Sequence, residues 1–227
     1  PADKQVDMGV FTIGEKKYRL IFTKSNLTAT GLAANEYDYG DYFAWGATEP
    51  WYSEINNTST NCSDWTAVWK SDKTDGYYDN NCPSYNNDAV YVENGILKME
   101  YDPARTILGG EWQLPTKKIW VELIAVSKKS WKKKKKGYKF ENNDKTLFLP
   151  ASGDVVGSKF RSVSSYGIYW SGTADSETEK ANRFGFLYNG DVLVTVSSLR
   201  YCGYSVRPVR LVEVPAATTE GYNVDDD

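Results

Sequence analysis

Apolar and polar residues alternate over short runs through most of the chain, and this pattern predicts short β-strands. We expect a hairpin within residues 1–24, because runs at 10–13 and 18–22 flank the turn residues 14–17. Further strands are predicted at residues 147–150, 167–171, 183–187, 192–196 and 204–210. The chain is therefore predicted to be rich in short strands.

One helix has a clear start signal in the sequence. Thr116 is a favourable N-cap residue, and the apolar residues that follow share one helical face: Ile119, Trp120, Leu123 and Ile124. A second, shorter helix is expected to begin near Pro103. Few helices among many strands predict an α+β fold, with one or two helices, small twisted antiparallel sheets and long ordered loops.

A polar tract rich in Asn, Asp, Ser and Tyr interrupts the strand pattern at residues 49–93. Its aromatic side chains argue against disorder, so we expect an ordered, loop-rich insertion. The tail at residues 215–227 is small, polar and acidic, and we expect it to be flexible. The prediction is a single domain over residues 1–214, followed by this tail.

The chain contains no histidine, and this removes several kinds of chemistry. A Ser-His-Asp or Cys-His nucleophile, an imidazole base and a His-containing metal site are all excluded. Cys62 and Cys82 lie in similar polar loops, where they either pair or remain unrelated thiols. Asn and Asp oxygens suit Ca²⁺, but no Ca²⁺-loop pattern is present. We therefore expect neither an enzyme nor a bound cofactor.

The overall charge favours neither nucleic acid nor membranes. The formal net charge is −3, so we expect no nucleic-acid partner, and the lack of an apolar run of about 18 residues predicts no membrane insertion. The five lysines at residues 132–136 stand out. We interpret them as a solvated loop or hairpin tip, because no aromatic interleaving or phosphate-binding glycine loop accompanies them. The alternative is a patch for an anionic ligand.

Five short blocks follow one another along the chain: YGDYFAWG at residues 39–46, GEWQLPT at 110–116, LPASG at 149–153, YWSG at 169–172 and GYSVRPV at 203–209. This ordered set resembles the Fibrobacter succinogenes major paralogous domain family. The resemblance implies a C-type-lectin-like fold, in the subgroup that contains the formylglycine-generating enzymes. It also implies an extracellular place, on the surface of a bacterium or on a phage virion.

The blocks have scaffold roles that follow from their chemistry. Thr116 caps the helix, and we expect Arg207 to be held by carbonyls or a carboxylate beneath the sheet. Ile119 stands where the family has the Glu of a capping box, so an apolar contact is expected there instead. The calcium motifs of sugar-binding animal lectins are absent, and Cys202 has no second cysteine beside it. The resemblance therefore implies neither calcium-dependent sugar binding nor the formylglycine-generating activity.

Some members of this fold are variable proteins of diversity-generating retroelements, whose adenine-directed mutagenesis cannot produce Lys, Glu, Gln, Met or Trp codons. These five types make up 45 of the 227 residues, yet residues 181–212 contain none, where the overall composition predicts about six. The preferences of strands account for part of this depletion of Lys and Glu. We therefore expect residues 181–212 to be a C-terminal variable region.

Alternation gives this region two faces. One face is expected to be buried: Phe184, Phe186, Val192, Val194 and Val196. The other face and the residues around it supply the candidate ligand-binding residues: Tyr166, Ile168, Arg183, Gly185, Leu187, Asp191, Leu193, Thr195, Ser198, Leu199, Tyr201 and Cys202. An exposed apolar and aromatic patch is typical of a binding face. The alternative is that its apolar side chains face a second core layer.

These features favour a non-enzymatic module that binds a protein or glycan receptor on another cell, with Tyr, Leu and Arg supplying the contacts. The alternative is a structural or assembly domain of a bacterial surface or pilus protein, in which the same side chains contact another domain. The chain begins at Pro1 rather than Met. We therefore expect a carrier or anchoring domain outside this sequence.

Overall fold

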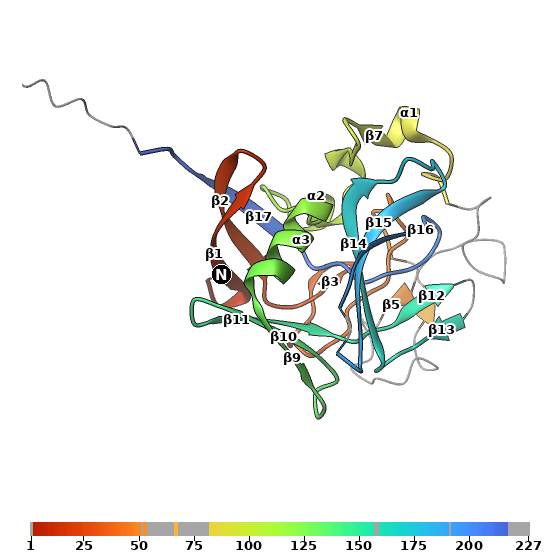
Figure 1. Cartoon of the computed structure of the whole chain (residues 1–227). Coiled ribbons are helices and arrows are strands. Elements are labelled where there is room, and N and C mark those ends of the chain that lie inside the picture. Colours follow the sequence, from red (N-terminus) through yellow and green to blue (C-terminus); the bar gives the residue numbers. More distant parts are fainter. Residues whose placement is uncertain are drawn as a thin grey trace, which may run out of the picture.

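The computed structural model describes residues 2–50, 52–53, 66–67, 82–156, 159–190 and 192–217. Most of the insertion expected at residues 49–93, and most of the tail expected at 215–227, lie outside this part. The described residues are mostly β-structure in small antiparallel sheets with few helices, which confirms the α+β class (Figure 1). They contain three α-helices where one or two were predicted, because the short α1 (Asp88–Tyr91) has no helical signal in the polar tract.

The described α-helices lie in the middle third of the chain. They are α1 (Asp88–Tyr91), α2 (Pro103–Leu108) and α3 (Lys117–Val126), with short 3₁₀ turns η1 (Ala2–Lys4) and η4 (Met99–Tyr101). The Thr116 hydroxyl accepts a hydrogen bond from the Ile119 amide at 3.4 Å, so the predicted N-cap is confirmed. Ile119 is buried in the core, as expected from the missing capping box.

The first and last described strands share one sheet, in the order β1-β2-β17. Its members are β1 (Gln5–Ile13), β2 (Lys16–Thr23) and β17 (Val209–Val214). Strands β1 and β2 form the predicted hairpin, and Gly14 supplies the positive φ of 65° that its turn needs.

A second sheet carries the lysine run at the tip of a hairpin. It has the order β11-β10-β9, with β9 (Lys128–Lys132), β10 (Gly137–Asn142) and β11 (Lys145–Pro150). Residues 132–136 form the exposed end of the β9–β10 hairpin, which confirms the hairpin-tip interpretation.

The third sheet contains the region of the candidate site, in the order β16-β15-β14-β8-β7. Its strands are β7 (Val92–Glu93), β8 (Ile96–Leu97), β14 (Tyr166–Ala174), β15 (Lys180–Leu187) and β16 (Val192–Leu199). Short two-stranded pairs complete the β-structure: β3 (Leu27–Thr28) with β4 (Gly31–Leu32), β5 (Tyr52–Ser53) with β6 (Thr66–Ala67), and β12 (Asp154–Val156) with β13 (Lys159–Arg161).

The main core lies around α3, which Figure 1 shows between the β1–β2–β17 sheet and the β14–β16 strands. Trp120 of α3 is fully buried and stacks on Phe184 at a centroid distance of 4.8 Å. All three larger sheets contribute side chains to this core, for example Phe22, Phe140 and Phe186. The apolar face predicted for the helix is therefore what joins the three sheets.

A second core covers the opposite face of β14 and β15. It contains Ile168, Trp170 and Ala181 of these strands, together with Phe43 and Trp45 from the first half of the chain. The Trp170 indole donates to the Phe43 carbonyl at 2.7 Å, and the Trp45 indole donates to the Ser171 carbonyl at 2.8 Å. Strands β14 and β15 are therefore covered on both faces over much of their length.

The five motif blocks meet in this part of the molecule. Blocks 39–46 and 203–209 pair at Phe43 and Tyr204, and blocks 110–116 and 203–209 pair at Gln113 and Val209. Further hydrogen bonds join Gly172 to the Pro115 carbonyl at 3.0 Å, and the Tyr42 hydroxyl to the Ser152 carbonyl at 2.6 Å. The blocks, far apart in the sequence, thus form one hydrogen-bonded scaffold.

Asp102 connects α2 to the motif block at residues 110–116. Its carboxylate accepts from the Ala104 amide at 2.9 Å, as the N-cap of α2, and from the Leu114 amide at 2.8 Å. The side chain is buried, and burial raises the pKa of Asp102 to about 6. The helix expected near Pro103 is therefore present, and a buried carboxylate positions it.

Because the folded pKa of Asp102 lies above its ordinary value of 3.8, the folded protein binds more protons than the unfolded chain between these two values. As the pH rises from 4 to 6.5, the free energy of unfolding of the protein should therefore fall by about 2 kcal/mol relative to that of the Asp102→Asn variant. Urea unfolding of both proteins across this range measures the difference. Asp175→Asn is the control, because hydrogen bonds, the first from Ser197, lower the pKa of Asp175 below its ordinary value of 3.8. Asp175 therefore titrates below the measured range, and the difference between Asp175→Asn and the unchanged protein should stay nearly constant across it. A pH-independent difference for Asp102→Asn would contradict the prediction.

Candidate ligand-binding surface

One face of the third sheet carries the partly exposed candidate residues. Tyr166 lies opposite Leu187 in the β14–β15 register, and Arg183 lies opposite Val196 in the β15–β16 register. Directly opposed side chains of antiparallel strands share a face. We call Tyr166, Arg183, Leu187, Val196 and Ser198 the β14–β16 surface.

The Arg183 guanidinium is held in place on this surface. Its Nε donates to the Ser198 hydroxyl at 2.6 Å, and its Cζ lies 5.7 Å from the centre of the buried Tyr204 ring. Gly185 leaves the space for it, since a Cβ at this glycine would lie 2.6 Å from Nη1 of Arg183. A partly exposed guanidinium, which carries five N–H donors, can bind a carboxylate, a phosphate or a carbonyl.

Buried groups lie beneath Arg183. Burial raises the pKa of Cys202 to about 11, against the opposing charges of Arg161 and Arg183. Burial also raises the pKa of Tyr204. At neutral pH the Cys202 thiol is therefore protonated, and in this form it is a poor nucleophile. Of these two residues, Tyr204 is the one whose ring lies against the Arg183 guanidinium.

The expectation that Val196 is buried is wrong. Its side chain is 40% exposed, because the β15–β16 register shifts between the pairs Arg183–Val196 and Gly185–Leu193. Such a bulge moves the following side chains of β16 to the other face. Phe184 and Phe186, on the strand without the extra residue, are buried as predicted.

Several candidate residues belong to the second core rather than to the surface. Ile168 and Cys202 are only 7% and 6% exposed, and Gly185 is buried in the sheet. Leu199 and Tyr201 are partly buried and pack against the same core, as does Tyr166 at the edge of the β14–β16 surface. Ile168, Cys202, Leu199 and Tyr201 therefore fit the alternative expectation, in which the side chains face a second core layer.

Three further candidates cannot be placed as side chains on this surface. Asp191 lies outside the described residues. Leu193 and Thr195 lie within β16, but the structure describes only their backbone.

Burial accounts for part of the missing Lys, Glu, Gln, Met and Trp at residues 181–212. Residues 202–209 are all buried, and such positions seldom hold Lys or Glu. Arg200 is also buried, where it donates to the Ser84 and Lys180 carbonyls at 2.8 and 3.0 Å and pairs with Asp88 at 2.6 Å. Burial does not explain the absence of these residue types at the exposed positions between Leu187 and Ser198.

Two residues near the surface were not predicted. Tyr188 follows β15 directly and is 61% exposed, which makes it the most exposed large apolar residue described. Arg161 of β13 forms an ion pair with the buried Asp154 at 2.5 Å. Tyr188 lies within the predicted variable region, next to the candidate Leu187, whereas nothing local in the sequence connected Arg161 to this region.

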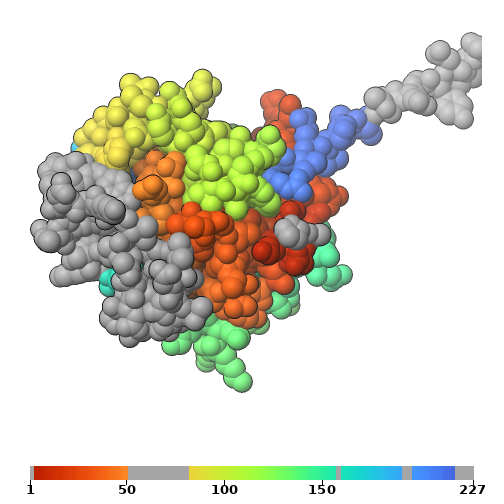
Figure 2. Space-filling view, turned by 180° about the vertical axis from the view of Figure 1, so that it is seen from behind, coloured from red at the N-terminus to blue at the C-terminus, as the bar shows by residue number. Residues whose placement is uncertain are grey.

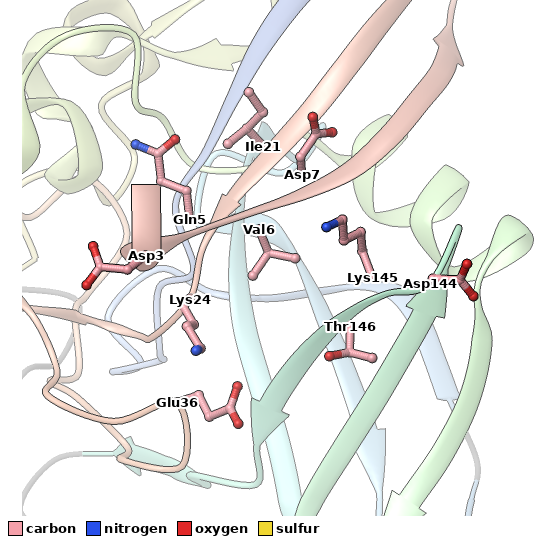
Figure 3. Close-up of a pocket in the computed structure, with 10 residues that line it drawn as sticks. All are labelled: Asp3, Gln5, Val6, Asp7, Ile21, Lys24, Glu36, Asp144, Lys145 and Thr146. Carbon is pink, nitrogen blue, oxygen red and sulfur yellow. The ribbon is translucent and has the colours of Figure 1, made fainter. Parts of the chain in front are cut away.

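A hollow of about 600 Å³ lies elsewhere and has mixed charge. Figure 3 shows Lys24 and Glu36 on one side of it, and Asp144 and Lys145 on the other. Asp7, also on its lining, is bound by Arg19 at 3.0 Å. The acidic residues of this hollow lie among basic ones. They do not form the pair of carboxylates in an apolar setting that acid–base catalysis uses.

Within the described part, no cluster of three or more His, Cys, Asp or Glu side chains is arranged to hold a metal ion. Cys82 is a free, buried thiol, while Cys62 lies outside the described residues. Among the described helices, none has the length and apolar character needed to cross a membrane.

Comparison of the chain with models of protein families, with curated proteins and with solved structures finds no match. The resemblance based on the five blocks therefore stays a prediction.

Proposed function

We propose that the chain is a non-enzymatic binding module that presents the β14–β16 surface to a protein or glycan receptor on another cell. The observation that carries this proposal is Arg183, fixed by Ser198 and by the space at Gly185, and flanked by the partly exposed Tyr166 and Leu187. A rigid cation among aromatic and apolar side chains is the composition of a binding hot spot.

The proposal includes a C-type-lectin-like fold of the family that the five blocks resemble. Its support is that the blocks form one scaffold beneath the surface, through the pairs Phe43–Tyr204 and Gln113–Val209. In this arrangement, the scaffold keeps its residues while the exposed positions above it change. The proposed location is the surface of a bacterium or a phage virion.

We further propose that a diversity-generating retroelement rewrites these exposed positions. Sequencing the gene in many sibling isolates should find substitutions clustered at residues such as Arg183, Leu187, Tyr188 and Val196, without Lys, Glu, Gln, Met or Trp. Phe184 and Phe186, from the same stretch but within the core, are the internal control and should stay unchanged.

Evenly spread substitutions, with Lys or Glu at Leu187 or Tyr188, would overturn the retroelement proposal. That outcome would favour the alternative of a structural or assembly domain. Equal variation at the core residue Phe184 and at the surface residue Leu187 would also contradict the retroelement proposal. That proposal confines the changes to exposed positions, because substitutions in the core destabilise the fold.

A further inference from the structure

A second candidate site lies between the β9–β11 sheet and the loop that carries Glu36 and Tyr37. It is a hollow of about 550 Å³, which is within the range of small-ligand pockets. Figure 2 shows the green β9–β10 hairpin projecting at the lower edge of the molecule, beside the orange segment that precedes the insertion. The site uses none of the residues of the β14–β16 surface.

The floor of this hollow is aromatic. Tyr37 is 39% exposed, and its ring meets the buried Phe148 ring edge-on at a centroid distance of 5.0 Å. Gly137 makes this packing feasible, because a Cβ there would lie 2.4 Å from Cζ of Phe148. The Tyr37 ring is therefore supported from below and keeps part of its surface open to solvent.

Lysines surround this ring. Residues 132–135 and Lys139 line the hollow, and Lys135 Nζ lies 4.3 Å from the centre of the Tyr37 ring. The register places Lys139 opposite Phe148 on the same face of the sheet. Glu36 is the one carboxylate in the lining, so positive charge is in excess.

The charge of Lys139 is partly engaged elsewhere. Its Nζ pairs with Glu141 at 2.8 Å, and this hydrogen bond, helped by the charges of Lys128 and Lys132, lowers the pKa of Glu141. Lysines 132–135 at the hairpin tip are exposed, and Lys135 makes its described contact with a ring rather than with an acid. The sequence showed no aromatic residue within the lysine run, but the fold brings Tyr37 to it.

We propose that this hollow binds a polyanionic carbohydrate, a chain of sugar rings that carry sulfate or carboxylate groups. The apolar face of one sugar ring lies on Tyr37, and the lysines of the tip bind the acidic groups on either side. Lysine suits such spaced single charges, whereas arginine suits bidentate contacts. Of the aromatic side chains that line the hollow, Tyr37 is exposed, Trp131 is partly buried against the main core and Phe148 is buried. One exposed ring suits one sugar rather than the successive bases of a nucleic-acid strand, which need several stacking platforms.

The test measures binding of a heparin-derived hexasaccharide to the protein by calorimetry at 50 mM and 150 mM salt. Polyphosphate and a single-stranded oligonucleotide of equal charge are the comparison probes. The triple variant K133Q/K134Q/K135Q removes three charges at the tip, and K17Q/K117Q/K118Q removes three exposed charges elsewhere. Tyr37→Ala removes the platform without changing the charge.

We expect the hexasaccharide to bind at least tenfold more tightly than either comparison probe. The tip variant should weaken this binding at least tenfold and reduce its salt dependence, while the control triple variant changes it less than twofold. Tyr37→Ala should weaken hexasaccharide binding at least fivefold and leave polyphosphate binding unchanged.

Three results would overturn the proposal: no hexasaccharide binding at 50 mM salt, equal binding of polyphosphate or oligonucleotide, or equal losses in the two triple variants. Circular dichroism of each variant shows whether it is folded. Since the β14–β16 surface is intact in all of them, failure here leaves the proposed receptor surface untouched.

Discussion

Replacing Arg207 with alanine is expected to destabilise the protein by about 4 kcal/mol. The side chain is fully buried, its Nε donates to the Asn26 side chain at 2.9 Å, and its Nη1 donates to the Phe148 carbonyl at 2.8 Å. Alanine would leave both acceptors without these donors and create a large cavity. Burial lowers the pKa of Arg207 to about 10, so the guanidinium is still charged at neutral pH.

Two further substitutions separate these contributions. Arg207→Met fills much of the volume but offers no donor, so its cost reports the hydrogen bonds. Arg207→Lys keeps a charge but cannot span both acceptors, so we expect it to cost about 2 kcal/mol. Chemical unfolding measures all three variants, and Arg210→Ala, a partly exposed arginine of β17, is the control. A loss below 1 kcal/mol for Arg207→Ala would show that the buried guanidinium contributes little.

The elements that could be predicted are those whose signals are local. The cap at Thr116 and the apolar face of α3 lie within nine residues, and the Gly14 turn lies between its own two strands. Arg207 could also be placed beneath the sheet, because the motif block around it predicted a held, buried arginine. It contacts a carbonyl and an amide rather than a carboxylate.

The faces of β14–β16 could not be predicted because they depend on distant segments and on one extra residue. Alternation alone cannot show that Phe43 and Trp45 cover Ile168 and Trp170. Nor does it reveal a shift in register, which exposed Val196. The candidate surface is consequently smaller than the sequence suggested, and it centres on Arg183.

The same limit applies to the lysine tip. Its lysines are contiguous in the sequence, but the ring beneath Lys135 comes from Tyr37, on a loop far earlier in the chain. A search of the lysine segment finds Trp131 beside the run but misses the exposed ring of Tyr37. Sheet register and loop packing, rather than local composition, create it.

Replacing Gly167 with alanine is expected to destabilise the protein by about 3 kcal/mol. Gly167 of β14 lies opposite Phe186 of β15, and a Cβ at Gly167 would lie 1.9 Å from Cζ of that ring. Phe186 is fully buried and packs on Tyr138 at a centroid distance of 4.9 Å, so its ring has little space to move. The strands that carry Tyr166 and Leu187 would be forced apart at this point.

A double variant tests this reason directly. Phe186→Leu removes the ring atoms that meet the new Cβ, so Gly167→Ala should cost at least 1.5 kcal/mol less in the Phe186→Leu background, a coupling about as large as is found for residues in contact. Gly172→Ala is the matched control on the same strand, because a Cβ there meets its nearest atoms at 3.5 Å, which is ordinary contact. Equal losses for Gly167→Ala in both backgrounds would show that the ring does not cause them. Rescue by Phe186→Leu would show that this glycine lets the core close beneath the β14–β16 surface.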